Sequence, residues 1–331
     1  MILGMVIGAG ALSLPRSASK VMGPAAWWLM AVIGVVYIII AAVNASVARV
    51  YPDETFPELV VKFFGRPVGF AAGLLLSVFF LLVIPAESKV MMELVNIALL
   101  PLAPPWFIVG SFLLVCLYMA FRGMDTVAQV NQILIGISFT VLIITIVLAW
   151  QFFQPDRLLP ILDIHNVKIF SAEWLNIAFT FLGFQIILLI APYLREPRKL
   201  FRDTVTSMAA VTVRSVNWPI LELAKAINIS GIFIERLDLL LVIAWIPAIF
   251  TTAAGGYYFC ALSLGHLFSM ERLHPILWLL FPATVFLTYI VDNVFTLQSW
   301  IAAASLLGMV STMLLPVGHL IYLAKRKISE T

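Results

Sequence analysis

The sequence predicts an all-α polytopic membrane protein, and three properties of the chain indicate this fold class. Of its 331 residues, 63% are hydrophobic and only 11% are charged, whereas a soluble domain is about 45–50% apolar and about 25% charged. The mean hydropathy is +1.07. The apolar residues form long continuous runs instead of the alternating pattern of a membrane β-barrel strand. Backbone groups in lipid must bond internally, so these runs are expected to cross the membrane as helices.

The same composition excludes three other classes of protein. A disordered chain has low hydrophobicity and high net charge, and the net charge here is +3. The two cysteines, Cys116 and Cys260, lie inside apolar runs and are too few for a disulfide scaffold. Most of the basic residues are scattered singly along the chain, so no nucleic-acid partner is expected. The expected partner surface is the lipid bilayer.

The chain divides into candidate membrane-spanning segments at its charges, prolines and glycines. A span needs about 20 mostly apolar residues. In chain order the candidates are 1–21, 25–49, 67–100, 104–121, 125–150, 174–194, 204–213, 233–268, 274–291 and 294–324. All are long enough to cross except 204–213, which ends at Arg214. Either this seventh helix is truncated, or the sequence skips residues there.

The connections between the segments predict the orientation of the chain. Residues 151–173 are expected to form a solvated outer loop. Residues 214–237 are expected to form an amphipathic helix on the outer face, because apolar positions after Pro219 recur at helical spacing. With the N-terminus in the cytoplasm and every segment crossing, most Lys and Arg residues fall in inside connections. Both termini are therefore predicted to be cytoplasmic.

Small residues interrupt the first segment at Gly8, Ala9, Gly10 and Ala11. Such residues permit close helix packing, but two glycines so close together also lower helix propensity in the middle of a span. An unwound turn would free backbone groups for a carboxylate or ammonium group. Close packing and a ligand cavity are both open interpretations of this stretch.

A second interruption lies in the sixth segment, where Thr180 and Gln185 flank Gly183. Paired glycine-interrupted helices at matching places are typical of inverted-repeat transporters and their binding sites. The sequence therefore predicts a five-plus-five inverted-repeat transporter-like bundle of about ten transmembrane helices, with the first and sixth helices broken. It would be a single transmembrane domain over residues 1–331, with pseudo-repeats 1–150 and 174–324 joined by the outer loop 151–173.

Several motifs resemble a known family. Gly-Ala-Gly-Ala-Leu-Ser-Leu-Pro at 8–15 resembles the first-helix break of the amino acid–polyamine–organocation transporter superfamily, and Phe-Leu-Gly-Phe-Gln at 181–185 is similar to its sixth-helix motif, with Gln185 in place of the usual acid. Within it, three stretches resemble the B subunit of spore germinant receptors, the spore germination permeases. They are Pro-Tyr-Leu at 192–194, Trp-Pro-Ile-Leu-Glu-Leu at 218–223 and Glu-Arg-Leu-Asp at 235–238.

The resemblance implies a membrane-embedded receptor subunit that binds a small nutrient germinant, typically an amino acid, and helps to trigger spore germination. It would act with A- and C-type receptor subunits in the inner membrane of a bacterial spore. The implied cavity lies between the two broken helices, with third- and eighth-segment residues completing its wall. The expected ligand-binding residues are Gly8, Ala9, Gly10, Ala11, Thr180, Phe181, Gly183, Phe184, Gln185, Val83, Glu87, Thr251 and Thr252.

Glu87 is a candidate on its own account, because charged residues inside a membrane are functional candidates by default. The alternative function is an ion-coupled secondary transporter of amino acids, in which Glu87 is the remaining acid able to carry a proton. The four histidines are dispersed without metal-ligand spacing. There is no nucleophile–base arrangement or phosphate loop. No enzyme activity, metal or cofactor is therefore expected.

Overall fold

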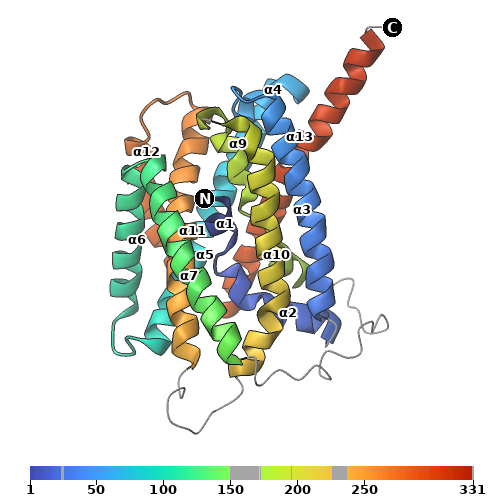
Figure 1. Ribbon diagram of the computed structural model, residues 1–331. Helices are drawn as coiled ribbons and strands as arrows, with labels where there is room; N and C mark the ends of the chain where they lie inside the picture. The colour runs from blue at the N-terminus through green and yellow to red at the C-terminus, as the bar shows by residue number, and fades with distance from the viewer. Residues whose placement is uncertain (24–25, 150–170, 172, 195, 226–236, 330–331) are drawn as a thin grey trace.

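The computed structural model describes every residue except 24–25, 150–170, 172, 195, 226–236 and 330–331. Within this described part, the regular structure is helical throughout (Figure 1). The α-helices are α1 (Ile2–Val6), α2 (Gly10–Met22), α3 (Ala26–Val50), α4 (Phe56–Phe64), α5 (Arg66–Ala98), α6 (Pro105–Phe121), α7 (Met124–Ala149), α8 (Glu173–Phe179), α9 (Ile187–Ile190), α10 (Leu200–Lys225), α11 (Leu237–Leu267), α12 (His274–Ile290) and α13 (Val294–Ser329). The 3-10 turns given for the described residues are η5 (Phe184–Ile186), η6 (Ala191–Tyr193) and η7 (Pro197–Lys199).

The long helices run alternately up and down one bundle, with α1, the break after it and α5 at its centre (Figure 1). Among the described residues, five helices are long and apolar enough to cross a membrane, and the bent pair α8 and η5–η6, taken as one span, makes a sixth. The helices α6 and α12 are apolar but shorter. Large apolar side chains such as Leu279, Val147 and Phe286 are exposed on outer faces of the bundle, as expected where lipid covers them. The protein is an integral membrane protein.

The short helix α4 lies across one end of the bundle (Figure 1). Thr55 and Glu58 form a capping box at its start, and Gly65, with φ of 93°, ends it. Its apolar face is buried, including Phe56 and Phe63. Because a glycine adopts this positive φ without strain, the chain turns there directly into α5.

The helix α10 corrects the prediction of a short seventh segment. It extends over 26 residues, Leu200–Lys225, which is about 39 Å at 1.5 Å per residue and longer than the hydrocarbon core of about 30 Å. The predicted separate amphipathic helix at 214–237 was wrong over 214–225, because α10 continues through these residues. The remainder, 226–236, lies outside the described residues, as does nearly all of the predicted outer loop 151–173.

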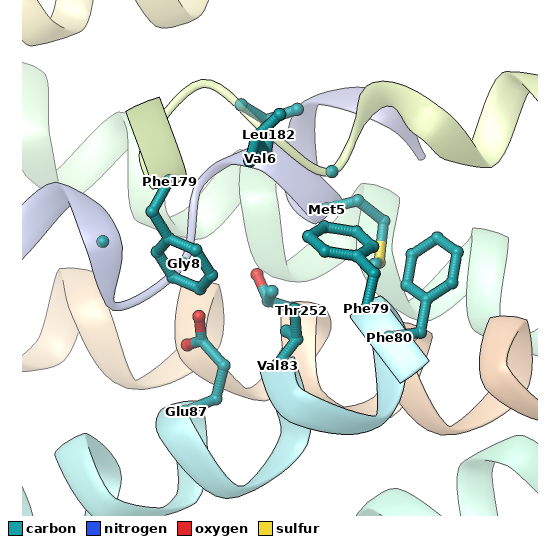
Figure 2. Close-up of a pocket in the computed structure, with 12 residues that line it drawn as sticks. Met5, Val6, Gly8, Phe79, Phe80, Val83, Glu87, Phe179, Leu182 and Thr252 are labelled. Atoms are coloured by element: carbon teal, nitrogen blue, oxygen red, sulfur yellow. The ribbon is translucent and has the colours of Figure 1, made fainter. Parts of the chain in front are cut away.

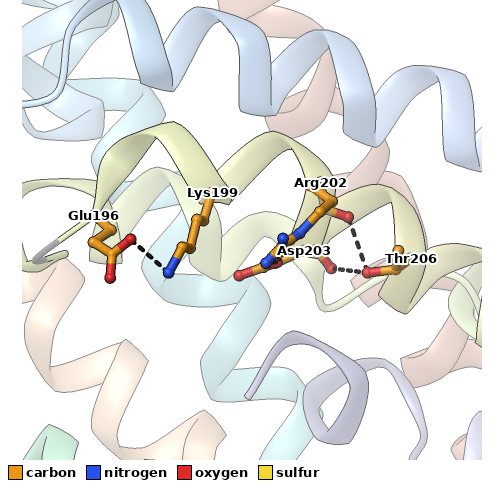
Figure 3. Close-up of polar contacts among 5 residues, drawn as sticks. All are labelled: Glu196, Lys199, Arg202, Asp203 and Thr206. Atoms are coloured by element: carbon orange, nitrogen blue, oxygen red, sulfur yellow. Dashed lines mark hydrogen bonds and ion pairs between the residues drawn. The ribbon is translucent and has the colours of Figure 1, made fainter.

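The reason for this error is the placement of charge along α10. Two exposed ion pairs lie near its start (Figure 3). Glu196 and Lys199 pair just before the helix, and Arg202 and Asp203 pair in its first turn. Farther along, Arg214 is buried with its guanidinium 4.1 Å from the ring centre of Trp245 on α11. A cation–π contact of this kind stabilises an arginine inside a helix bundle. A prediction from hydropathy alone does not include this contact, so it ended the segment at Arg214.

Both predicted helix breaks are confirmed. The first falls at residues 7–9, between α1 and α2, and the second at 180–183, between α8 and η5. The axes on the two sides of the second break differ by 48°. The two breaks lie beside each other inside the bundle, against α5 and α11 (Figure 2).

Candidate functional site

The first break places a backbone donor opposite the carboxyl group of Glu87. After α1 ends at Val6, the N–H of Gly8 bonds to the Val6 carbonyl at 3.2 Å instead of continuing the α-helical pattern. The next N–H, of Ala9, donates to both oxygens of Glu87 on α5, at 2.9 and 2.8 Å. Glu87 is fully buried. Its carboxyl group therefore accepts one of the backbone N–H groups that have no helical partner at the start of α2, within the protein interior.

The other side of the same break is held by α11. The hydroxyls of Thr251 and Thr252 lie 3.3 and 2.9 Å from the carbonyl oxygen of Gly4. Both threonines are buried. A carbonyl that loses its helical donor at a break requires another partner, and here the threonine hydroxyls supply it.

The second break is closed by Gln185. Gly183 has φ of 109°, and its N–H donates to the side-chain oxygen of Gln185 at 2.5 Å. The amide nitrogen of Gln185 donates in turn to the carbonyl of Gly308 on α13, at 3.3 Å. In this structure Gln185 therefore fixes the turn and ties it to α13.

Glycines bring the two breaks into contact. A Cβ on Gly183 would collide with the carbonyl oxygen of Met5. A Cβ on Gly10 would lie 2.7 Å from a ring carbon of Phe179 and 3.2 Å from the Cα of Thr180. Side chains at either glycine would hold the two broken helices apart, so this close approach requires glycine.

A small cavity lies where the breaks meet (Figure 2). The centre of a water molecule could occupy a volume of about 10 Å³ inside this cavity. The cavity therefore has room for about one water molecule. Glu87 and Thr252 supply polar side chains to a wall that is otherwise apolar or glycine. The lining residues are Met5, Val6, Gly8, Gly10, Phe79, Phe80, Val83, Glu87, Phe179, Leu182, Gly183 and Thr252.

The structure brings six of the predicted site residues to this wall: Gly8, Gly10, Val83, Glu87, Gly183 and Thr252. Four others, Ala9, Thr180, Thr251 and Gln185, lie at the breaks behind the wall. Phe181 and Phe184 do not line the cavity, and their rings pack against Tyr37 of α3, with centres 5.5 and 6.5 Å away. Ala11 lies in the first turn of α2.

Sequence reasoning missed six lining residues: Met5, Val6, Phe79, Phe80, Phe179 and Leu182. The sequence did contain a pattern that could have identified Phe79. Phe79, Val83 and Glu87 are spaced by four residues, so they share one face of α5. Phe179 carried no comparable signal, because its position at the wall depends on where α8 ends.

An ion pair joins the two broken spans at the end of the bundle away from α4. Lys20, near the end of α2, lies 2.5 Å from Glu173 at the start of α8. The Glu173 carboxylate also accepts a hydrogen bond from the side-chain amide of Asn176, at 3.1 Å. The ion pair fastens α2 to α8.

The described residues hold no cluster of three or more His, Cys, Asp or Glu side chains that could bind a metal ion. The polar groups at the breaks are backbone amides, hydroxyls, one side-chain amide and the Glu87 carboxyl. Such groups can bind and orient a small polar ligand.

Comparison with known proteins identifies a family and several relatives of this chain. The family model described as "Spore germination protein" matches residues 1–216 and 204–295, in two parts that overlap within α10. Spore germination protein B2 of Bacillus subtilis (strain 168) is 26% identical over 309 residues, with 87% of this chain and 83% of that protein covered. Spore germination protein A2 of the same organism is 24% identical, with 82% and 79% covered.

A relative from another species covers nearly the whole chain. Spore germination protein GerLB of Bacillus cereus is 23% identical over an alignment of 344 positions, which covers 97% of this chain and 92% of that protein. The names of these relatives refer to germination and not to catalysis. The chain belongs to the spore germination protein family.

Proposed function

We propose that this protein is the membrane-embedded subunit of a spore germinant receptor, and that it binds an amino acid in the cavity between its two broken helices. The observation that carries the proposal is this cavity, at which both breaks meet around Glu87. Interrupted helices at matching places are a recurrent way to present backbone groups to a small ligand within a membrane.

The chemistry of the wall favours a ligand with an ammonium group. Glu87 is the charged residue of the lining, and its carboxylate would bind that group while it holds the Ala9 N–H. The glycines allow the backbone to approach the ligand closely, and the Thr252 hydroxyl adds a polar contact. The remaining predicted residues at the breaks, including Ala11, Thr180, Thr251 and Gln185, would position this backbone.

Under this proposal the structure represents a closed state, because the cavity is too small for the ligand. Room for about one water is too little for an amino acid, so binding would require the wall to open. A ligand shifts such an equilibrium only through its higher affinity for one state. The signal would therefore be the change in population of the open arrangement that ligand binding produces.

The proposal also includes the arrangement of the membrane spans and the partner subunits. The ten spans would form two five-helix halves, residues 1–150 and 174–324, as a single transmembrane domain, with both termini in the cytoplasm. The partners would be A- and C-type receptor subunits in the inner membrane of the spore. The germination relatives support this assignment over an amino-acid transporter.

Ligand screening tests the proposed site. The midpoint of thermal unfolding of the purified protein, measured against a panel of amino acids, should rise for at least one of them. Val83→Phe fills the cavity from α5, so that response should disappear. Val68→Phe is the matched control, because Val68 is exposed on the same helix and the response should persist. An unchanged response in Val83→Phe contradicts the site.

Two further measurements address the role of the protein. Spores that carry Val83→Phe should lose germination with the amino acid that stabilises the purified protein, while Val68→Phe spores keep it. In liposomes, the protein alone should not accumulate that amino acid. Accumulation without partner subunits would overturn the receptor-only function and favour a transporter.

A further inference from the structure

A row of polar and small residues runs along one face of α7. Gln129, Gln132, Gly136 and Thr140 are all exposed or open to the surface. Because they lie three or four residues apart, they share one side of the helix. Together with three aliphatic neighbours they line a hollow of about 720 Å³. We refer to these four residues as the polar row.

The polar row points away from the bundle. Asn131 is 1% exposed, and its side-chain amide lies where a Cβ on Gly4 of α1 would be. Two residues of an α-helix correspond to about 200° of rotation, so Gln129 lies on the opposite side of α7 from Asn131. Only 28% of the apolar window of α7 is buried, against 72% for α11. The polar row therefore faces lipid in a membrane.

Gln132 lies at a depth where lipid cannot bond to its amide. The helix α7 has 26 residues, or about 39 Å, and Gln132 is about 12 Å from its start. A helix of this length, centred on a hydrocarbon core of about 30 Å, extends about 4–5 Å beyond it at each end. Neither Gln132 nor Gln129 has a hydrogen-bond partner in the described part of the chain. Amides at membrane depth usually bond across a contact between helices.

Gly136 leaves a notch in the middle of the polar row. A Cβ at this position would meet no atom within 4 Å, so the packing of this chain does not require a glycine there. One turn farther on, the Thr140 hydroxyl donates to the Gly136 carbonyl at 2.9 Å. Two small residues four positions apart let the backbones of two membrane helices approach closely. A contact with a helix of another chain would use this notch.

We propose that the polar row binds the same face of a second copy of this chain, so that two molecules pair through α7 within the membrane. The hydrogen-bonding groups favour this partner. A glutamine side chain carries both donors and an acceptor, so its amide complements an identical amide. None of the four residues is charged, so identical faces do not repel each other.

The symmetry of the membrane fits the same pairing. Two copies inserted in one orientation can be related by a two-fold axis along the membrane normal, as in a closed dimer. The axis then places Gln132 opposite its own equivalent and brings the two Gly136 notches together. The pairing lies on the far side of α7 from α1 and depends on neither the cavity nor its ligand, so it goes beyond the function proposed above.

Cysteine cross-linking in membranes tests the pairing. A disulfide requires Cα atoms within about 7 Å of each other, so Gly136→Cys should form a linked dimer of twice the 36.7 kDa chain mass on oxidation. Leu279→Cys is the matched control, because Leu279 is 72% exposed on the separate helix α12; it should give at least tenfold less dimer. The native Cys116 and Cys260 are buried. Equal yields at the two positions, or a link from Gly136→Cys to a different protein only, would overturn the proposal.

The mass of the purified protein in detergent tests the same interface without a covalent link. Gln129→Leu/Gln132→Leu removes the amides, and Gly136→Ile fills the notch. Each variant should dimerise at least tenfold more weakly than wild type, with an unchanged circular-dichroism spectrum, because these side chains contact lipid. Leu279→Ala should dimerise like wild type. A wild type that stays monomeric at every concentration, or dimers that both variants leave intact, would contradict the pairing.

Discussion

Gly183 shows how a single residue fixes the contact between the two broken helices. Its φ of 109° is strained for any residue with a Cβ. The added carbon would also meet the backbone carbonyl of Met5, and a backbone atom cannot rotate aside as a flexible side chain can. The strain and the collision both destabilise the same variant, Gly183→Ala. The loss of stability should therefore be large for the addition of one methyl group.

Gly183→Ala is therefore expected to destabilise the protein. Strain at the positive φ contributes about 1–3 kcal/mol, and the collision with α1 adds to it. Gly110→Ala is the control, because Gly110 lies inside α6 with open space around its Cα hydrogens. Alanine there should change stability by less than about 1 kcal/mol, in the stabilising direction. Thermal unfolding measures both, and equal midpoints for the two variants would contradict the close contact.

Residues at the site were predictable where their chemistry appears in the local sequence. Gly8, Gly10 and Gly183 interrupt apolar runs, and Glu87 is an acid within one. Phe79 and Phe179 look like ordinary apolar residues of a span, and only the packing of distant segments brings them to the cavity.

At the scale of elements, the packing of α10 against α3 gives the seventh segment its place in the bundle. Gly34 on α3 faces Thr212 on α10, whose side chain would collide with any Cβ at position 34. Thr212 is buried, and its hydroxyl bonds to the Met208 carbonyl of its own helix. A glycine opposite a small polar residue is a usual contact between membrane helices.

Gly34→Ala is expected to cost about 1–3 kcal/mol, as is common when a carbon is forced into a packed interface. Thr212→Ala in the same chain should restore part of that loss, because it removes the two nearest colliding atoms, Cγ2 and Oγ1. The four unfolding midpoints of this double-mutant cycle measure the coupling. Additive effects of the two substitutions would show that α10 and α3 do not pack in this way.

The elements themselves were largely predictable, and α10 explains the exception. Long apolar runs identify α3, α5, α7 and α13 without any knowledge of their partners. In α10 the charges at 202, 203 and 214 interrupt the run. The partner that shelters Arg214, the Trp245 ring, is distant in sequence. Hydropathy is calculated from residues that are close in sequence. It therefore cannot show that the Trp245 ring, which is distant in sequence, stabilises the buried Arg214.

At the scale of the whole molecule, the charge distribution predicts an orientation. The end of the bundle that carries α4 and the C-terminus also carries the ends of α3, α6 and α11 (Figure 1). The expected inside basic residues, including Arg49, Lys62, Arg122 and Lys325, belong to these connections. The positive-inside rule therefore predicts that this end faces the cytoplasm.

Cysteine labelling in vesicles tests the orientation. Leu102, between α5 and α6, is 97% exposed, and Ser269, after α11, is exposed at the opposite end. An impermeant maleimide should label Leu102→Cys in right-side-out vesicles and Ser269→Cys in inverted ones. The native Cys116 and Cys260 are buried and give little background. The reverse pattern would place the termini outside.

The small cavity at the breaks has a consequence for the kinetics of ligand association. A cavity with room for about one water cannot admit an amino acid by diffusion into a preformed site. Opening must come first, and motions of packed helices take microseconds to milliseconds. The observed association rate should therefore level off as the ligand concentration increases, at the rate of opening. The response time of the protein would then be set by its own packing, and not by how much nutrient surrounds it.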